Sequence, residues 1–381
     1  MSWQTAKIGN LLAKVKRAGK LQATEYQETG RFPVIDQGQN DIAGYSDNTE
    51  ILHTEPLPIV IFGDHTRRVK LARDPFICGA DGTQLLYPKN EDLDPVFFYH
   101  AVKNVDLSNY AYARHFKFLK DQEVSYPDLP TQQRISGILS AYDDLIENNR
   151  RRIGLLEQAA RLLYREWFVH LRFPEHETAK IVAGLPEGWE RMPASEAVHI
   201  NPRTAWKGSE SKLITMVPMG ALSTSGMNCD PSQFERREQP AGVKFMNGDT
   251  LFARITPCLE NGKTGFVNFL QEGEVACGST EFVVFRERRI SRFMAYLLAR
   301  EEGFRKNAIT SMVGSSGRQR VQPSCFDKYL VPIPPKSVVE DFDRVVEPMF
   351  REIEHIDKAI SKLTRARDLL LPRLMDGRIP V

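Results

Sequence analysis

The stretch that decides the fold is TQQRISGILSAYDDLIENNRRRIGLLEQAARLLYREWFVHL, which runs from Thr131 to Leu171. Its apolar positions alternate in steps of four and three, a mean period of 3.5 that keeps one stripe of a helix facing a partner helix. At about 1.5 Å per residue, one helix of this length would be on the order of 55–60 Å long, so we expect a second helix to cover the stripe. The stripe consists of Ile135, Leu139, Tyr142, Ile146, Asn149, Ile153, Leu156, Ala160, Leu163 and Trp167.

A second copy of this stripe lies about 207 residues further along the chain. Identities such as Ile146/Ile353 and Leu163/Leu370 accompany it, and both copies are entered through prolines, VSYPDLP in the first and VPIPP in the second. One offset aligns the stripe and the proline entry together, which favours an internal repeat over two unrelated core helices. The second stripe consists of Phe342, Val346, Met349, Ile353, Ile356, Ile360, Leu363, Arg367, Leu370 and Leu374.

Composition places the chain among soluble globular proteins. Its 381 residues are enough for two or three domains, and a net charge of +2 means that an acidic partner must be met by local patches. The five cysteines are odd in number and form no CxxC, which indicates a reducing cytosol and argues against a disulfide scaffold or a zinc site. We expect no signal peptide at the N-terminus, and the charge-free run Leu213–Cys229 is too broken by Pro, Gly and Ser to span a bilayer.

Short apolar runs between turn residues predict an irregular α+β module on either side of the first long helix. Each module also contains a short predicted helix, at Asp94–Asn104 and at Ser291–Glu302. The predicted strands are Phe32–Ile35, Leu57–Phe62, Phe76–Cys78 and Leu85–Tyr87 in the first module, and Leu213–Val217, Thr250–Ala253, Gly265–Phe269 and Glu281–Phe285 in the second. The predicted organisation is a module at 1–126, a long helix at 127–171, a linker at 172–188, a second module at 189–331 and a second long helix at 332–381. A faint local echo relates ICGADGTQLLYP (Ile77–Pro88) to ACGSTEFVVFR (Ala276–Arg286).

The second long helix carries its own signals. Ser337 and Glu340 have the spacing of a capping box, and Pro348 should kink the helix or divide it. Asn149 and Arg367 occupy stripe positions, where polar residues fix the register of paired helices. We expect the outward-facing apolar residues to await partner subunits; these are Leu145, Leu155, Leu162, Ile333 and Leu369.

Two antiparallel long helices separating two diverged modules would suit a ligand that repeats at a fixed distance. Duplex DNA does so at about 34 Å per turn. The modules would then read different base sequences while the helices set the gap between them.

Three motifs carry a family resemblance: SYPDLPTQQRISGIL, EWFVHLRFP followed by LPEGWE, and VPIPP. GDTLFARITP (Gly248–Pro257) and PIVIFGDHTR (Pro58–Arg67) add to it. With these motifs and its repeat, the chain resembles the specificity subunit of type I restriction-modification systems over essentially its whole length. A departure is Pro348, where the first helix has Ala141.

The resemblance implies a non-catalytic, cytoplasmic subunit with two α/β target recognition domains separated by a long antiparallel two-helix coiled coil. Each domain would read one half of a bipartite, asymmetric duplex DNA target. The helices would set the spacing and dock two methyltransferase subunits, which carry S-adenosylmethionine. Restriction subunits, which use ATP and Mg²⁺, would join through the assembled complex. No cofactor, metal or membrane contact is expected of this chain itself.

Signals for catalysis are weak. The stretch from Pro257 to Thr264 ends in GKT but lacks the first glycine of a phosphate-binding loop and precedes a strand-like run, so it predicts a hairpin turn that carries a DNA-facing Lys263. The histidines show neither HxxxH nor HExxH spacing.

DNA contacts are expected from Arg, Lys and small polar residues on glycine-rich loops, because Arg matches guanine edges and phosphates while Asn and Gln match adenine. The two clusters just before the proline entries, at Arg114–Lys117 and Ser315–Arg320, occupy matching places in the two halves. For any single arginine, a solvated surface charge is an equally good interpretation. The candidate DNA-binding residues are Arg67, Arg68, Lys70, Thr83, Gln84, Arg114 and Lys117 in the first module, and Arg254, Lys263, Ser315, Ser316, Arg318, Gln319 and Arg320 in the second.

Two alternatives remain open from the sequence. The chain could be an autonomous DNA-modifying or DNA-cleaving enzyme, which turnover of DNA or labelled S-adenosylmethionine by the chain alone would reveal. It could also be a helical scaffold protein without DNA binding, in which case charge reversal at Arg318 and Arg320 would leave DNA affinity intact.

Overall fold

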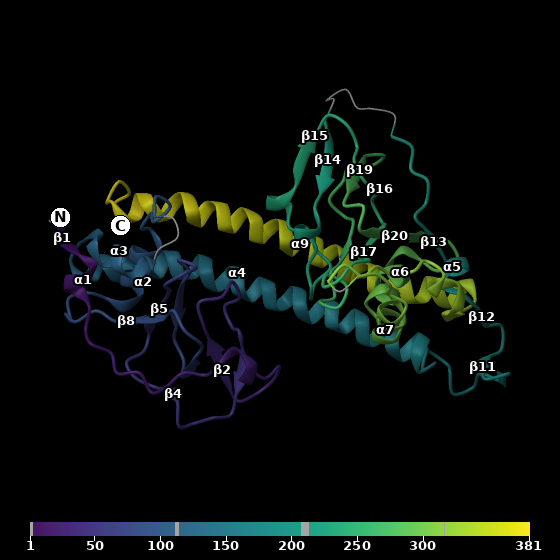
Figure 1. Cartoon of the computed structure of the whole chain (residues 1–381), viewed down its shortest axis with the longest axis horizontal. Helices are drawn as coiled ribbons and strands as arrows, with labels where there is room; N and C mark the ends of the chain where they lie inside the picture. Colours follow the sequence, from purple (N-terminus) through teal and green to yellow (C-terminus); the bar gives the residue numbers. More distant parts are fainter. Residues whose placement is uncertain (1–2, 111–113, 207–212, 316) are drawn as a thin grey trace. The chain divides into compact units, whose positions relative to one another are not determined.

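The computed structural model describes residues 3–110, 114–206, 213–315 and 317–381. The chain divides into two compact units: unit 1 contains Met1–Glu147 and Ser361–Val381, and unit 2 contains Asn148–Ile360. Two long helices, α4 (Leu129–Tyr164) and α9 (Lys336–Met375), each contribute one part to unit 1 and the other to unit 2 (Figure 1). Each unit is therefore a module together with a segment of both long helices.

Helix α4 begins where the sequence provides a cap and a proline. The Asp128 carboxylate accepts a hydrogen bond from the Thr131 amide at 3.0 Å, which satisfies one of the free N–H groups of the first turn. The helix ends in a π-helical turn, Arg165–Val169, and Leu171 then adopts a φ of +58°. Gly377 adopts the same left-handed conformation, with a φ of +73°, just after the end of α9.

Helix α9 differs from its prediction in two respects. It begins at Lys336, so Ser337 lies inside the first turn and the predicted capping box is wrong; Glu340 instead approaches the Lys336 ammonium at 3.5 Å. The helix also continues without interruption through Pro348, so that proline does not divide it.

The two long helices run antiparallel within each unit. In unit 1, Ile135 and Leu139 of α4 share a core with Leu371 and Leu374 of α9. In unit 2, the late part of α4 lies against the early part of α9, with the Trp167 ring 5.5 Å from that of Phe342. All the residues of both predicted stripes are buried or half-buried, which confirms the 3.5-residue pattern.

Unit 1 contains two small sheets. One has the strand order β3-β2-β7-β4, in which β2 and β7 run parallel, and the other has the order β6-β5-β8 and is antiparallel. The strands are β2 (Phe32–Ile35), β3 (Gly44–Ser46), β4 (Leu52–His53), β5 (Ile59–Gly63), β6 (Val69–Ala72), β7 (Phe76–Cys78) and β8 (Thr83–Leu86).

Unit 2 repeats both sheets and adds β13 at the edge of the second. The order β15-β14-β19-β16 again has one parallel pair, β14 with β19, at its centre, and β17 occupies the place of β5 in the order β13-β20-β17-β18. The strands are β13 (Val198–Ile200), β14 (Ile214–Val217), β15 (Glu235–Arg237), β16 (Val243–Met246), β17 (Thr250–Ala253), β18 (Thr264–Phe266), β19 (Val275–Gly278) and β20 (Phe282–Glu287). The α+β class and the internal repeat are therefore confirmed by strand order, although the two modules are strongly diverged in sequence.

Short elements complete each unit. In unit 1 these are β1 (Gln4–Lys7) paired with β9 (Glu123–Tyr126), and the helices α1 (Ile8–Leu11), α2 (Pro95–Lys103) and α3 (His115–Asp121). In unit 2 they are β12 (Glu190–Pro193) paired with β21 (Leu330–Ile333), the hairpin β10 (Ile181–Val182) with β11 (Leu185–Pro186), and the helices α5 (Ala194–Ala197), α6 (Arg292–Arg300), α7 (Glu302–Thr310) and α8 (Cys325–Lys328). Short 3-10 turns lie at Ala23–Glu25, Met219–Ala221 and Pro231–Gln233. Ile333 lies in β21 and is only 3% exposed, so its assignment to an exposed face is wrong, whereas Leu145, Leu155, Leu162 and Leu369 are exposed as predicted.

In each unit one module helix, α2 or α6, is joined to a long helix by a hydrogen bond between a carboxylate and a hydroxyl. The two groups have swapped sides: the carboxylate belongs to the module helix in unit 1 and to the long helix in unit 2. In unit 1, Asp94 caps α2 and accepts a hydrogen bond from Ser136 of α4 at 3.1 Å. In unit 2, Ser291 caps α6 and donates to Asp343 of α9 at 2.6 Å. The repeat has thus kept the bond while exchanging the two chemical groups.

Candidate nucleic-acid interface

Three backbone segments meet at one end of the β6-β5-β8 sheet in unit 1. The Asp64 amide, just after β5, donates to the Gly82 carbonyl at 2.7 Å, just before β8. The Asp64 carbonyl in turn accepts from the amide of His115 at 2.9 Å, where α3 begins. The predicted clusters around Arg67, Thr83 and Arg114 are therefore brought together.

Unit 2 builds the same junction. The Arg254 amide after β17 donates to the Glu281 carbonyl at 2.9 Å, and the Arg254 carbonyl accepts from the Val321 amide at 2.8 Å. Strand register gives the same equivalence, since Gly63 pairs with Thr83 in unit 1 and Ala253 pairs with Phe282 in unit 2. Arg114 and Arg320 therefore occupy the same backbone position in the two units.

The candidate side chains of unit 1 divide into an exposed group and a group that is buried or half-buried. Arg67, Arg68, Arg114 and Lys117 are exposed. Arg67 adopts a φ of +60° and donates to the Leu107 carbonyl at 2.9 Å, and Arg68 donates to the side-chain oxygen of Gln39.

The other three candidates of unit 1 are buried or half-buried and also have partners within the protein. The Thr83 hydroxyl is buried and bonds the Ala80 carbonyl at 3.2 Å, and Gln84 accepts from Arg17 at 2.7 Å. Lys70 is only 7% exposed and its ammonium donates to the Asp36 carbonyl at 2.7 Å, with burial lowering its pKa. Lys70 is thus a structural cation.

In unit 2 the other candidates lie on two loops beside Arg254, which is itself half-buried and donates to the Val321 carbonyl at 3.4 Å. The segment from Val313 to Arg320 folds back on itself through a pair of backbone hydrogen bonds between these two residues, at 2.9 and 3.1 Å. Ser315, Arg318 and Arg320 on this segment are exposed, and Gln319 is half-buried. Ser316 lies outside the described residues.

Lys263 lies on the turn between β17 and β18, which is a hairpin as predicted. The residue is half-buried, however, and its ammonium donates to the Met219 carbonyl at 2.9 Å, so in this structure the charge is bonded within the protein.

Three residues support these junctions; Gln37 and Glu281 were missed from the sequence, whereas His115 lies inside the predicted cluster Arg114–Lys117. Gln37 accepts from the His65 amide at 3.1 Å and donates to the Asp81 carbonyl at 2.8 Å, so it joins two of the loops. Both ring nitrogens of His115 lie within hydrogen-bond distance of backbone carbonyls, those of Asp64 and Tyr110. Glu281 forms a two-oxygen ion pair with Arg320. No local pattern identifies Gln37 or Glu281, because each acts on a segment far away in the chain.

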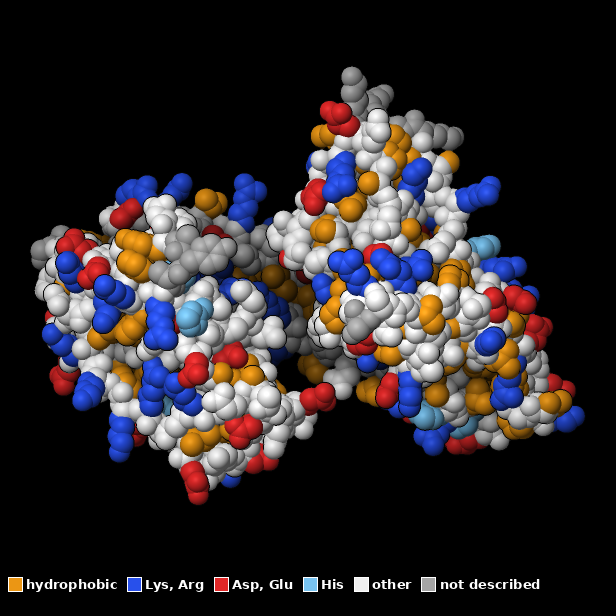
Figure 2. All heavy atoms as spheres, in the orientation of Figure 1, with side chains coloured by type: hydrophobic (Ala, Val, Ile, Leu, Met, Phe, Trp, Pro, Cys, Tyr) orange, Lys and Arg blue, Asp and Glu red, His pale blue; other side chains and the backbone are white. Residues whose placement is uncertain are grey.

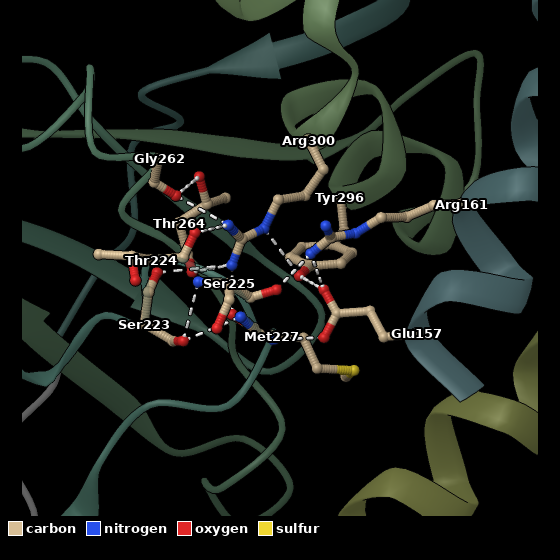
Figure 3. A network of polar contacts seen from close by, with 11 residues as sticks. Glu157, Arg161, Ser223, Thr224, Ser225, Met227, Gly262, Thr264, Tyr296 and Arg300 are labelled. Carbon is tan, nitrogen blue, oxygen red and sulfur yellow. Dashed lines mark hydrogen bonds and ion pairs between the residues drawn. The ribbon is translucent and has the colours of Figure 1, made fainter. Parts of the chain in front are cut away.

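A buried polar network fastens the loops of unit 2 to α4 (Figure 3). The Arg300 guanidinium of α6 is 9% exposed and donates to the carbonyls of Gly262 at 2.7 Å and Thr264 at 3.0 Å, on either side of Lys263. It also donates to the Thr224 carbonyl at 3.0 Å. A buried guanidinium that meets this many carbonyls holds the turn that bears Lys263 in one conformation.

Glu157 of α4 is the anionic centre of this network. It is 3% exposed and accepts hydrogen bonds from the Tyr296 hydroxyl at 2.5 Å, from the Met227 amide at 2.8 Å, and from Arg161. Burial raises the pKa of the Tyr296 phenol, which keeps it protonated as a donor to the carboxylate.

Unit 1 has a related arrangement. Tyr99 and Lys103 of α2 match Tyr296 and Arg300 in position, and the Lys103 ammonium donates to the Tyr99 hydroxyl at 3.0 Å. Here the carboxylate is Asp143 of α4, 3.5 Å from Lys103 and 2.6 Å from Arg367 of α9. Arg367, predicted to fix helix register, is therefore paired across the two long helices.

Surface charge is mixed on the face that Figure 2 shows, with a compact group of Lys and Arg side chains near the centre of the unit 2 face. Within the described ranges, no group of three or more His, Cys, Asp or Glu side chains is placed to hold a metal ion. The described helices include none that is both long and apolar enough to cross a membrane.

Comparison with known proteins finds similarity to one class of protein. A family model described as "Type I restriction modification DNA specificity domain" matches residues 1–158. The MjaIX specificity subunit of a type I restriction enzyme from Methanocaldococcus jannaschii is 26% identical over 276 residues, which cover 69% of this chain and 62% of the relative. The EcoEI specificity subunit from Escherichia coli is 32% identical over 157 residues, which cover 40% of this chain and 26% of the relative. The chain thus spans less than two thirds of the length of either relative.

A solved structure shares the fold along the whole chain. The S subunit of a type I restriction-modification system from M. genitalium has a TM-score of 0.54 and 14% sequence identity, and the match covers 98% of this chain and 96% of that one. The similarity to type I DNA specificity domains therefore lies in residues 1–158. Over 276 residues the chain is similar in sequence to the MjaIX specificity subunit, and it shares its fold with the M. genitalium S subunit.

Proposed function

We propose that this chain is the DNA sequence-specificity subunit of a type I restriction-modification complex and that each unit reads one half of a bipartite, asymmetric duplex target. One observation carries the proposal: the two units build the same three-segment junction but present different side chains from it. Arg67, Arg68 and Arg114 are exposed in one unit, and Ser315, Arg318 and Arg320 are exposed in the other. Equivalent scaffolds with different polar groups suit a target whose halves differ in sequence.

The long helices would set the gap between the half-sites and dock two methyltransferase subunits. Exposed leucines on their outer faces, such as Leu155 at 66% exposure, support this assignment, because large apolar side chains at a solvated helix surface favour a partner. S-adenosylmethionine would be bound by those partners, and ATP and Mg²⁺ by restriction subunits that join the complex. The chain itself would be non-catalytic and cytoplasmic.

The test is to assemble the full chain with its co-expressed methyltransferase subunits and to select from a library of randomised duplexes at moderate salt. We expect a motif with two specified blocks separated by a gap of constant length. Uniform binding of all duplexes would overturn the proposal. Turnover of DNA or labelled S-adenosylmethionine by the chain alone would favour the enzyme alternative.

A further inference from the structure

The ion pair between Glu281 and Arg320 lies at the junction of unit 2 and has a defined geometry. Arg320 Nε is 2.9 and 3.0 Å from the two Glu281 carboxylate oxygens, and Arg320 Nη2 is 2.7 Å from Glu281 Oε1. The Glu281 side chain is 22% exposed and that of Arg320 is 44% exposed. The carboxylate therefore holds the guanidinium by its Nε–Nη2 side, and Nη1 makes no hydrogen bond to any residue within the described ranges.

This orientation leaves a particular edge of the guanidinium available. Of its five N–H groups, those on Nη1 and the second one on Nη2 remain for a ligand. Two of them form the fork that matches the O6 and N7 acceptors of guanine in the major groove. A fork already fixed by a carboxylate loses less conformational entropy on binding, and a rotated guanidinium that would fit another base is disfavoured.

A carboxylate beside DNA requires an explanation, because it repels phosphates. The Glu281 pKa is lowered by its hydrogen bond with Arg320, so the group is an anion at neutral pH. An interface built only for phosphate contact would not retain that charge. Orientation of Arg320 accounts for its presence.

Unit 1 provides the internal comparison. Arg114 has the backbone position of Arg320, but Gly82 occupies the position of Glu281 and offers no side chain. The neighbouring carboxylate, Asp81, pairs with Lys20 at 2.7 Å, and no described residue forms an ion pair with Arg114. An arginine free to rotate follows a phosphate well but discriminates poorly between bases.

We propose that Arg320, oriented by Glu281, is a specificity-determining residue that reads a guanine in the half-site bound by unit 2, whereas Arg114 contacts the phosphate backbone in the other half-site. Glu281 acts through Arg320 as a positioning residue. The inference rests on the proposed function and adds to it the chemical identity of one base in the target.

The test uses the full chain assembled with its methyltransferase subunits, a randomised duplex library for selection, and competition with single-base variants of the selected motif. Arg320→Ala should lower the preference for guanine at one position on the order of 10- to 100-fold while leaving the other positions specified. Arg320→Lys should lose the same preference yet keep the salt dependence of binding, because a point charge replaces a fork. Glu281→Ala should weaken the preference at that same position without weakening binding to unrelated duplexes.

Two matched variants separate base reading from charge. Arg318→Ala removes an exposed arginine two residues away, and Arg114→Ala removes the equivalent arginine of unit 1. Both should lower affinity uniformly across sequences and reduce the slope of log affinity against log salt by about 1. Thermal unfolding of each variant confirms that it is folded.

The outcomes distinguish a failure of the proposed function from a failure of the assignment of Arg320. If the wild-type assembly selects no motif, the proposed function fails. If it selects a motif but Arg320→Ala and Arg320→Lys keep every base preference, the inference alone is overturned. A base-specific loss with Arg114→Ala would overturn the contrast between the two units.

Discussion

Individual side chains in this protein are defined by what they meet after folding. Lys70 and Lys263 were predicted to contact DNA because they lie near glycine-containing loops, as Arg318 does. In the structure, however, the Lys70 ammonium is buried and donates to the Asp36 carbonyl, and the Lys263 ammonium donates to the Met219 carbonyl. Arg318, by contrast, is exposed. A cation that bonds internal carbonyls would have to break those bonds to reach DNA, at a net cost of about 1.5–3 kcal/mol for each bond to a charged group. Exposed cations that bond no backbone carbonyl within the described ranges, such as Arg114, Lys117 and Arg318, therefore remain the better candidates.

Asp343 gives a pH-dependent prediction at this scale. Burial raises the pKa of Asp343 to about 6, although the hydrogen bond from Ser291 acts in the opposite direction. The folded state thus binds this proton more tightly than the unfolded chain, whose aspartates titrate near 3.9. The contribution to stability is complete below the unfolded pKa and is lost as the pH rises to about 6.

Asp343→Asn should remove this loss. We expect its free energy of unfolding, relative to that of the wild type, to rise by roughly 1–2 kcal/mol between pH 4 and pH 7. Denaturant unfolding at several pH values measures the difference. Asp341→Asn, an exposed carboxylate on the same turn, controls for the change in net charge. A constant difference across this pH range would show that Asp343 does not titrate there.

At the scale of elements, the stripes of the long helices tolerate polar residues, and α9 also tolerates a proline outside its stripe. Asn149 is buried in the stripe of α4, and Arg367 is paired with Asp143. Helix α9 passes through Pro348 with Met349 half-buried and Phe350 buried immediately after it. The apolar contacts of the stripe therefore outweigh the hydrogen bond that a proline removes, which costs about 3 kcal/mol in a helix interior.

Pro348→Ala should accordingly stabilise the protein. Pro348 is exposed, so the change removes no core contact and restores one helical N–H. We expect the free energy of unfolding to rise by about 1–3 kcal/mol, less a few tenths for the greater freedom of the unfolded chain. Ala141→Pro, at the equivalent exposed position of α4, should destabilise by about 3 kcal/mol or more. If Pro348→Ala were destabilising, a bend at that residue would be needed for the packing of α9.

At the scale of the whole molecule, two copies of one architecture have diverged in sequence while keeping strand order. The parallel pair β2/β7 corresponds to β14/β19, and the same backbone bonds join the three loop segments. The long helices contain the repeated apolar stripes and carry exposed leucines on their outer faces. This division is what the proposed function requires, in which the modules read different half-sites and the helices dock partner subunits.

Leu155 tests the role of the outer faces. Because this side chain is 66% exposed, Leu155→Gln should change the free energy of unfolding of the chain by no more than about 0.5 kcal/mol. It should nevertheless weaken assembly with the methyltransferase subunits, measured by co-purification and by titration of the partner. Ile333→Gln, at a residue only 3% exposed, should instead destabilise the chain by about 2 kcal/mol or more. Assembly of Leu155→Gln at wild-type strength would remove Leu155 from the docking surface.

The accuracy of the sequence-based predictions followed the range over which each signal acts. Strands Phe32–Ile35, Phe76–Cys78 and Thr250–Ala253 were predicted to the residue, because turn residues bound each short apolar run. The predicted helix Ser291–Glu302 instead divides at Glu301, whose side chain caps the next helix by accepting from the Phe304 amide at 2.8 Å. The local apolar pattern does not contain that competing bond.

The sequence by itself determined the two long helices, their facing stripes, the internal repeat and the presence of a module before each helix. These features depend on periodicity and on proline, which act through neighbours along the chain. Only the tertiary structure decided the order of the strands, the burial of Lys70 and Ile333, and the pairing of Glu281 with Arg320. Those features depend on contacts between segments tens of residues apart. Such contacts decide whether a cation is exposed and free to meet a ligand, or buried and bonded to the protein itself.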